Sequence, residues 1–334
     1  GVAAAALALR GRPRAGALLA ALSFAGIVDE AQNGPRIVRR LIRRRRVTVN
    51  VVARAGEREA RGDVKTVVVI AHHDAPQTGL IFDQSLQKRI YEVAPEVLER
   101  FKTAPPQWWL GLAGPLGTLA AALTRRRSLA RFALAIGALA TGLIADVARS
   151  ETVPGANDNL SGVAALVGLA ELFAERPIEN LRLMLVSCGA EETLQDGIRA
   201  FMSSHAGELD VRSTYFVNLD TVGSPHLVML EAEGPVWMES YSGPWLREET
   251  AAHAGRLGIE LRRGYRARAS TDSVIPSRAG YPIVTLVSMT DWLMPANYHL
   301  PSDVPENLDH AAVADATRLT FALAQHLAGA RASG

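Results

Sequence analysis

Apolar and polar positions follow two different periods along the chain from about residue 47 onward. Residues 47–55 alternate like a strand with one exposed face. Four continuous apolar runs are typical of strands buried on both faces, and they lie at 65–74, 181–189, 214–220 and 281–289. Helical patterns lie at 79–101, 160–175, 248–258 and 310–329. Strands that alternate with helices predict an α/β fold, with a mixed, mostly parallel sheet and helices on both faces.

Two long apolar runs do not fit this pattern. Residues 105–124 and 129–148 flank an Arg-rich tip, and their apolar side chains cover all faces of a helix. Their frequent small residues are typical of packed membrane helices. Trp108 and Trp109 stand at the start, where interfacial aromatic residues belong. We therefore expect a transmembrane helical hairpin inserted at 104–150, rather than a soluble helical cap that packs on the core.

Residues 1–46 predict a second membrane-associated segment. Apolar runs at 2–9 and 15–28 flank the basic tip RGRPR. The second run is shorter than the roughly 20 residues that a helical span needs. The run at 2–9 lacks the basic region that precedes the apolar part of a signal peptide. The expected organisation is this segment followed by a catalytic domain over 47–330, which the hairpin interrupts.

The basic tips predict the orientation of the chain in a membrane. Because positive residues favour the cytoplasmic side, RGRPR and TRRR would face the cytoplasm and the catalytic domain would lie outside it. The Arg-rich stretch 36–46 argues for the reverse. We expect a membrane protein with an extracytoplasmic catalytic domain and membrane lipid as a partner.

Composition narrows the classes of partner. The 334 residues are 48% hydrophobic and 21% charged, which allows a sizeable core. The net charge is only +2, and no aromatic residues interleave with the Arg runs at 36–46 and 124–127, so we expect no nucleic-acid partner. These runs predict a solvated surface or contact with lipid headgroups. Cys188 is the only cysteine, which excludes an intrachain disulfide and a thiolate zinc site. It lies in the apolar run 181–189, so we expect it to be a small buried residue.

Candidate metal ligands lie at or near the ends of the predicted strands. The set is His72, Asp158, Glu192, Asp220 and His299, with Glu191 as a spare carboxylate. The carboxyl ends of parallel strands meet at the edge where open α/β sheets bind ligands. Two imidazoles and three carboxylates can hold two divalent cations, and the spare carboxylate can then act as a base in hydrolysis.

Each of these residues also has an ordinary structural interpretation. A histidine at a strand end is usually a core or loop residue, and Asp158 can cap the helix at 160–175. The glutamate pair can be solvated, and Asp220 can form a turn. Only their combined order, His-Asp-Glu-Glu-Asp-His, points to metal chemistry.

Neighbouring residues are expected to support the ligands. A metal-bound imidazole usually donates its other N–H to a carboxylate or carbonyl, so we expect Asp74 to support His72 and Asp303 to support His299. His73 is expected to point to the opposite side of the strand from His72.

These segments resemble peptidase family M28, a family of zinc aminopeptidases. AHHD, GANDNLSG, GAEE, NLDTVG and YHLPSD are similar to the metal-binding elements of that family. The resemblance implies two zinc ions that share Asp158, although cobalt or manganese would suit the same donors. It implies that His72 and Asp220 complete one site and that Glu192 and His299 complete the other.

The resemblance also suggests catalytic and supporting roles. Glu191 aligns with the general base of the family, and Tyr298 stands where some members have a tyrosine that stabilises the transition state. Residues 270–284 are similar to a segment in which Asp272 would support the metal site, and Ser273 replaces the residue that is usual there. The largest departure is the apolar insertion between His72 and the GANDNLSG loop.

These observations predict a membrane-associated, two-zinc exopeptidase of the aminopeptidase type. Its substrate would be a peptide or an aminoacyl amide, attacked by water activated between the ions with Glu191 as the base. One alternative is a single-zinc, glutaminyl-cyclase-like enzyme or another amide hydrolase. The other is a non-catalytic, peptidase-like receptor or assembly domain. The sequence pattern leaves the oligomeric state open.

Overall fold

An eight-stranded sheet forms the centre of the α/β part of the chain. The computed structural model describes residues 1–42, 46–57, 64–103 and 109–329. The strands are β1 Val51–Gly56, β2 Lys65–His72, β3 Leu181–Cys188, β4 Thr214–Leu219, β5 His226–Glu233, β6 Glu239–Ser240, β7 Arg262–Ala267 and β8 Ile283–Met289. They follow the order β1-β3-β2-β4-β8-β5-β6, with β7 beside β5. Because β3, β2, β4 and β8 are parallel neighbours, the predicted mixed, mostly parallel sheet is confirmed.

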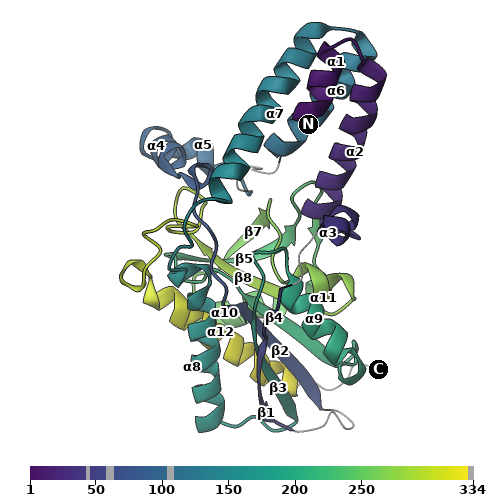
Figure 1. Ribbon diagram of the computed structural model, residues 1–334. Coiled ribbons are helices and arrows are strands. Elements are labelled where there is room, and N and C mark those ends of the chain that lie inside the picture. The colour runs from purple at the N-terminus through teal and green to yellow at the C-terminus, as the bar shows by residue number, and fades with distance from the viewer. Residues whose placement is uncertain (43–45, 58–63, 104–108, 330–334) are drawn as a thin grey trace.

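Helices cover both faces of the sheet (Figure 1). They are α4 Ser85–Val93, α5 Pro95–Glu99, α8 Ser161–Glu175, α9 Asp196–His205, α10 Pro244–Leu257, α11 Val274–Arg278 and α12 His310–Gly329. Short turns of other helix types are η1 Leu80–Phe82, η2 Ala156–Leu160, η3 Ala206–Glu208 and η4 Pro305–Asn307.

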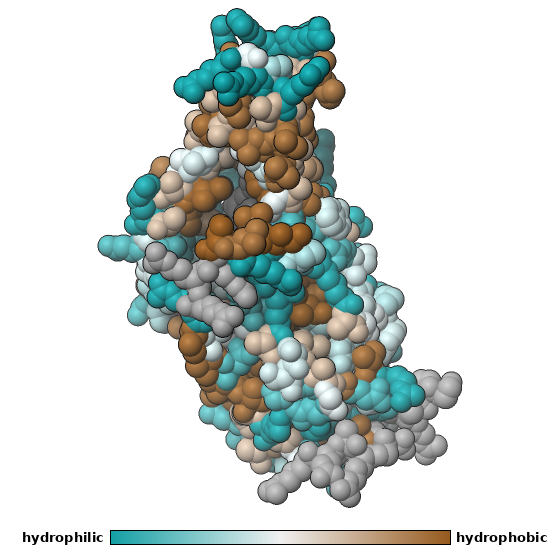
Figure 2. All heavy atoms as spheres, turned by 45° about the vertical axis from the view of Figure 1, so that its right-hand side comes forward, coloured by the Kyte–Doolittle hydropathy of each residue, from teal (hydrophilic) through white to brown (hydrophobic). Residues whose placement is uncertain are grey.

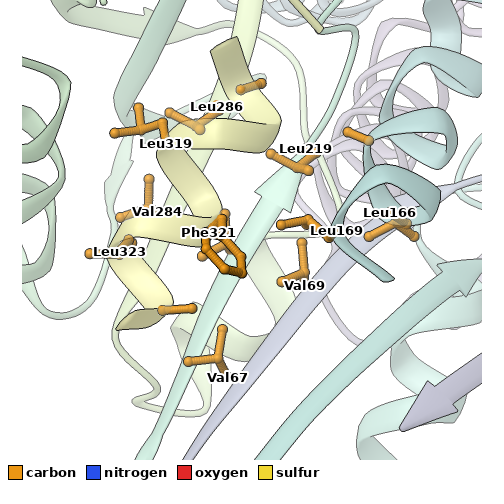
Figure 3. Close-up of a cluster of buried hydrophobic side chains, with 14 of the residues drawn as sticks. Val67, Val69, Leu166, Leu169, Leu219, Val284, Leu286, Leu319, Phe321 and Leu323 are labelled. Carbon is orange, nitrogen blue, oxygen red and sulfur yellow. The ribbon is translucent and has the colours of Figure 1, made fainter. Parts of the chain in front are cut away.

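Strand side chains alternate between two separate apolar clusters, because successive residues of a strand point to opposite faces. Val67 and Val69 join the cluster under α8, α10 and α12. Val68 and Ile70 join the cluster under α9. Figure 3 shows part of the first cluster, in which Leu169 of α8 and Phe321 of α12 lie around the strand residue Val69. Both faces of the sheet are therefore buried under apolar side chains, as the continuous apolar runs predicted.

Local differences from the sequence-based expectation have physical causes. The helix expected at 79–101 is divided into η1, α4 and α5. Pro95 begins α5, and Ala94 before it leaves the helical conformation. The pattern of apolar residues did not predict α9 or the strands β5 to β7. β7 is half exposed and pairs with β5 through an irregular register, so it carries no regular apolar pattern. The turn expected around 61–63 lies outside the described residues.

Four apolar helices form a bundle that stands away from the sheet (Figure 1). The bundle consists of α1 Val2–Leu9, α2 Pro13–Ala31, α6 Trp109–Thr124 and α7 Arg127–Val147, and the short α3 Ile37–Ile42 follows α2. Small residues let the helices approach closely, since a Cβ added at Gly114 of α6 would lie 3.1 Å from the Cα of Gly137 in α7. Over the described residues the bundle stands beside the sheet and does not cover the core.

The outer surface of the bundle is apolar. Its exposed large side chains include Leu18, Leu22, Leu116, Leu123, Phe132, Leu139 and Ile144. Figure 2 shows this apolar surface below a hydrophilic tip, and the arginines of RGRPR and TRRR are exposed. By length and composition, α7 could cross a membrane, whereas α6 is shorter. A helix of 21 residues is about 30 Å long, which matches the hydrocarbon core of a bilayer.

Two parts of the expected membrane-facing surface contact the α/β part of the chain instead. Trp109 donates its indole N–H to the carbonyl of Pro235 at 3.0 Å, and Trp108 lies outside the described residues. Arg36, at the start of the Arg run, is buried and pairs with Asp196 at 2.6 Å. Arg39 also pairs with Asp196, so a solvated or lipid-facing surface is the wrong expectation for these two arginines. Residues 43–45 of the run lie outside the described residues.

Candidate metal centre

The five predicted ligands and Glu191 meet at one edge of the sheet. His72 ends β2, the glutamate pair follows β3, Asp220 follows β4, and His299 lies in a turn after β8. These four strands are parallel neighbours, so their carboxyl ends open onto the same edge. Asp158 joins them from the loop η2, which precedes α8. Neighbouring parallel strands thus bring together side chains that are up to 227 residues apart, from His72 to His299.

Asp158 lies between the two histidines. Its Oδ1 atom is 3.2 Å from Nε2 of His72, and its Oδ2 atom is 3.1 Å from Nε2 of His299. The Asp158 side chain is buried, as are both imidazoles. One carboxylate therefore presents a different oxygen to each histidine.

Two triads of potential ligand atoms share Asp158. His72, Asp158 and Asp220 form one, and Asp158, Glu192 and His299 form the other. Within each triad the ligand atoms lie within 4.8 Å of one another. The resemblance to family M28 implies the same division into two sites. His72 also forms a triad with Glu191 and Glu192.

Unsatisfied atoms in the centre suit a bound cation. Asp158 Oδ2 and His299 Nε2 are buried and 3.1 Å apart, yet neither forms a hydrogen bond with a described residue. Buried polar atoms without partners are costly in proteins. A cation coordinated by both atoms would satisfy them, so the donor set of imidazoles and carboxylates fits zinc or a similar divalent metal.

The pKa shifts in the centre also favour a bound cation. Burial raises the pKa of Glu191 and Glu192 well above the usual value for a glutamate, and nearby carboxylates contribute. Burial also raises the pKa of Asp220 to about 6. For Asp158 burial acts in the same direction, but the imidazoles of His299 and His72 outweigh it and hold the pKa well below its usual range. The centre therefore collects more acids than its histidines balance, and divalent cations would offset this repulsion.

A buried glutamine holds the side chain of Glu191. Gln195 Nε2 donates to Glu191 Oε1 at 2.5 Å and to the carbonyl of Ser270 at 2.9 Å. Gln195 is 1% exposed, so water does not compete for these hydrogen bonds. Gln195 was not among the residues expected from the sequence, because a glutamine four positions after Glu191 has no distinctive pattern.

The carboxylates of Asp74 and Asp303 hold backbone loops. Asp74 accepts hydrogen bonds from the N–H groups of Glu191 and Glu192 at 3.0 and 3.1 Å. The ring Nδ1 of His72 is 3.1 Å from the carbonyl oxygen of Asp74 but 3.6 Å from its carboxylate. The carboxylate of Asp303 accepts the N–H groups of the Asp158 loop and forms no hydrogen bond with His299 among the described residues.

Asp272 is buried beside the centre. Neither of its carboxylate oxygens forms a hydrogen bond with a described residue. Burial raises its pKa to about 7, with Asp220 contributing and His72 opposing. Cys188 is also fully buried, as expected. His73 is exposed and its ring lies 2.9 Å from Ser187 Oγ, so it does point away from the centre.

Aromatic rings form one wall of the centre. The ring centroids of Tyr298 and His299 are 4.0 Å apart, and Phe82 of η1 lies 4.1 Å from His299. The backbone of η1 is tied to the bundle, because the N–H of Leu80 donates to Asp146 of α7 at 2.8 Å. Phe82 was not singled out by sequence reasoning, since its contact with His299 depends on the path of the chain between distant elements.

A second group of possible ligands lies elsewhere, between α10 and α12. Glu249, His253 and His326 bring their ligand atoms within 4.8 Å of one another and are partly exposed. The guanidinium of Arg256 is 3.2 Å from Nε2 of His253, and its charge opposes a bound cation. The buried centre at the sheet edge is therefore the stronger metal site.

Solved structures share the fold of this chain. The LapA aminopeptidase of Legionella pneumophila has a TM-score of 0.53 at 12% identity, over 84% of this chain and 55% of its own. BSAP, a zinc aminopeptidase from Bacillus subtilis, has a TM-score of 0.50 at 16% identity, over 85% of this chain and 52% of its own. A glutaminyl cyclase of Bacteroides thetaiotaomicron has a TM-score of 0.50 at 14% identity, over 83% and 76%. The chain thus spans about half the length of the two aminopeptidases.

A comparison with curated proteins finds no match. The family model described as "Peptidase family M28" matches residues 143–324, which is more than half of the chain. The matched region contains Asp158, Glu191, Glu192, Asp220 and His299. The chain belongs to peptidase family M28.

Proposed function

We propose that the protein is a metal-dependent hydrolase, and more specifically a membrane-anchored, two-zinc exopeptidase of the aminopeptidase type. The observation that carries this proposal is the position of Asp158, whose two oxygens face His72 and His299 at 3.2 and 3.1 Å. A carboxylate in this position can bridge two cations. Asp220 would complete one site and Glu192 the other.

Glu191 is the residue proposed to move the proton. When bound, zinc lowers the pKa of water and polarises a carbonyl group. Glu191 is buried beside His72 and Glu192, and its Oε1 atom is held by Gln195. Its second oxygen can then accept the proton of the attacking water and return it to the leaving amine.

Tyr298 is the proposed donor to the developing oxyanion. Burial raises the pKa of its phenol well above the usual value, and the carboxylates of Asp158 and Glu192 contribute. The phenol therefore keeps its proton over the physiological range and can donate a hydrogen bond. Asp272 is proposed to support the centre from its buried position beside Asp220.

We propose the same domain organisation that the sequence predicted. We assign residues 1–46 and the insertion 104–150 to a membrane anchor, and the rest of 47–330 to the catalytic domain. The exposed apolar sides of α2, α6 and α7 would face lipid. Because Arg36 and Arg39 pair with Asp196, they do not compete with the exposed tip arginines in setting the orientation. The tip would face the cytoplasm and the catalytic domain would lie on the other side.

The test combines a metal count with an activity assay. Elemental analysis of the purified chain should find two zinc ions, and aminoacyl reporter amides should be hydrolysed until a chelator is added. Asp158→Ala should lose both ions and all activity, whereas Asp210→Ala, at an exposed loop acid, should keep both. One tightly bound ion would favour the single-zinc alternative. No metal and no hydrolysis would favour the non-catalytic alternative and overturn the proposal.

A further inference from the structure

The turn after α2 docks on the loop that follows Glu191 and Glu192. Arg36 donates to the carbonyl of Leu194 at 2.9 Å and to the carboxylate of Asp196 at 2.6 Å. Asn33 Nδ2 donates to Oε1 of Gln195 at 2.5 Å. Three consecutive residues of the loop, 194–196, are thus held by the N-terminal segment. This segment precedes the catalytic domain in the sequence and continues directly from the bundle.

A chain of hydrogen bonds connects Arg199 to Glu191 through Asn33 and Gln195, and each residue donates to the next one. The guanidinium of Arg199 can only donate, and it donates to Oδ1 of Asn33 at 3.0 Å. The amide of Asn33 must therefore turn its NH₂ group toward Gln195. The oxygen of Gln195 accepts that hydrogen bond, which leaves its own NH₂ group for Glu191 Oε1 at 2.5 Å. Arg199, which can only donate, thus orients the amide of Asn33, and the carbonyl of Ser270 helps to hold the NH₂ group of Gln195 on the side of Glu191.

The same residues are shielded from water. Asn33 is 3% exposed, Gln195 1% and Glu191 8%. Gln195 has a positive φ of 61°, a conformation that non-glycine residues adopt only when their surroundings hold them there. Without the contact from Asn33, the oxygen of Gln195 would be buried without this partner, and the side chain could rotate.

We infer that Asn33 and Gln195 are positioning residues for Glu191, so that the segment leading from the membrane anchor completes the active site of the enzyme. The inference rests on the proposed role of Glu191 as a base. It assigns a second task to residues 1–46, which would otherwise serve only to hold the protein at a lipid surface. Neither residue contacts the candidate metal ligands through its hydrogen bonds, so the effect is expected on turnover and not on metal content.

The adjacent residue Gln32 supplies a matched control. Gln32 is also buried, and its Nε2 atom donates to the carbonyl of Trp237 and to Glu239. Its side chain therefore docks the same turn on the strand region β5–β6 and not on the Glu191 loop. Gln32→Ala should weaken the docking of the segment without disturbing the path to Glu191.

The decisive variant is Asn33→Asp. It keeps the shape of the side chain and adds a favourable charge beside Arg199, so the fold should be retained. It cannot donate to Gln195, which then either loses that hydrogen bond or turns its NH₂ group away from Glu191. We expect kcat to fall by about 10- to 100-fold, up to the lower limit of about 100-fold for the loss of a general base, with KM within about twofold. Gln195→Ala should do the same, whereas Gln32→Ala should keep kcat within about twofold.

Two readouts separate this inference from the proposed function. Zinc affinity, measured by chelator competition, should be unchanged in Asn33→Asp. In metal-free protein, the loss of melting temperature in Asn33→Ala plus Gln195→Ala should be smaller than the sum of the single losses, because both break one connected set of hydrogen bonds. If the wild type hydrolyses nothing, the proposed function fails. The melting temperatures of the single and double variants still show whether Asn33 and Gln195 are coupled. Additive shifts, or full turnover in Asn33→Asp, would overturn the inference.

Discussion

Asp303 accepts a hydrogen bond from the backbone N–H of Asp158, across 145 residues of sequence, at 3.1 Å. The other oxygen of the same carboxylate accepts the N–H of Asn157 at 2.6 Å. One buried side chain after β8 thus fixes the backbone of the loop that carries the shared carboxylate. The candidate metal centre is therefore held through the backbone of the Asp158 loop as well as through its histidine side chains.

Replacing Asp303 should therefore weaken metal binding. Asp303→Asn retains one acceptor but turns an NH₂ group toward one of the two backbone N–H groups, so the Asp158 loop loses a hydrogen bond. Groups that orient ligands typically contribute about 10- to 100-fold in metal affinity, and we expect a loss of that size in chelator competition. Asp315→Asn, at an exposed ion pair on α12, is the control. Equal affinities for the wild type and Asp303→Asn would show that the loop holds its shape unaided.

Glu191→Gln should separate metal binding from turnover. The amide keeps the size of the side chain and can still accept from Gln195, but it cannot take up a proton. We expect normal metal content with kcat reduced by at least about 100-fold, measured with aminoacyl reporters and elemental analysis on the same preparation. A variant that kept nearly the full rate would remove Glu191 from the mechanism.

Glu233 should make stability depend on pH. Burial raises its pKa to about 8, although hydrogen bonds from Tyr241 and Thr271 oppose the rise. The folded state therefore holds a proton that the unfolded state releases near pH 4.5. The resulting stability is fully present below pH 4.5 and is lost as the pH rises toward 8.

Glu233→Gln carries no titrating proton and tests this directly. Between pH 5 and 8 the free energy of unfolding of the wild type should fall relative to the variant by about 1.4 kcal/mol per pH unit at most. Chemical denaturation over that range measures the difference. Glu231→Gln, on the same strand but partly exposed, should run parallel to the wild type. Parallel curves for Glu233→Gln would mean that Glu233 is ionised in the folded protein.

Charges on the outside of the bundle should impair membrane association. Leu116 and Leu139 are 48% and 54% exposed on α6 and α7. An arginine within a lipid bilayer costs about 2.5–3.5 kcal/mol by insertion scales, so Leu116→Arg plus Leu139→Arg should reduce the fraction that floats with liposomes. Val167→Arg is the matched control, because Val167 is 56% exposed on α8 of the catalytic domain. Equal flotation of both variants, or no flotation of the wild type, would contradict a lipid-facing bundle.

The burial of each strand explains which strands could be predicted from the sequence. The runs at 65–74 and 181–189 correspond to β2 and β3, because strands buried on both faces need continuous apolar residues. The polar, half-exposed β7 has no such requirement and was missed. The prediction of one helix at 79–101 was wrong, since the periodicity of apolar residues does not reveal the break before Pro95.

Chain order alone determined the five candidate ligands, because metal chemistry restricts donors to a few residue types and parallel strands bring their ends to one edge. The tertiary structure decided which side chains support them. Asp303 supports the Asp158 backbone and not His299, and Gln195 and Asn33 reach Glu191 from segments that show no motif. Such amide and carboxylate contacts depend on side-chain orientation across distant segments, and no residue type or spacing encodes that. The sequence therefore predicts the candidate donors, while packing determines how they are held.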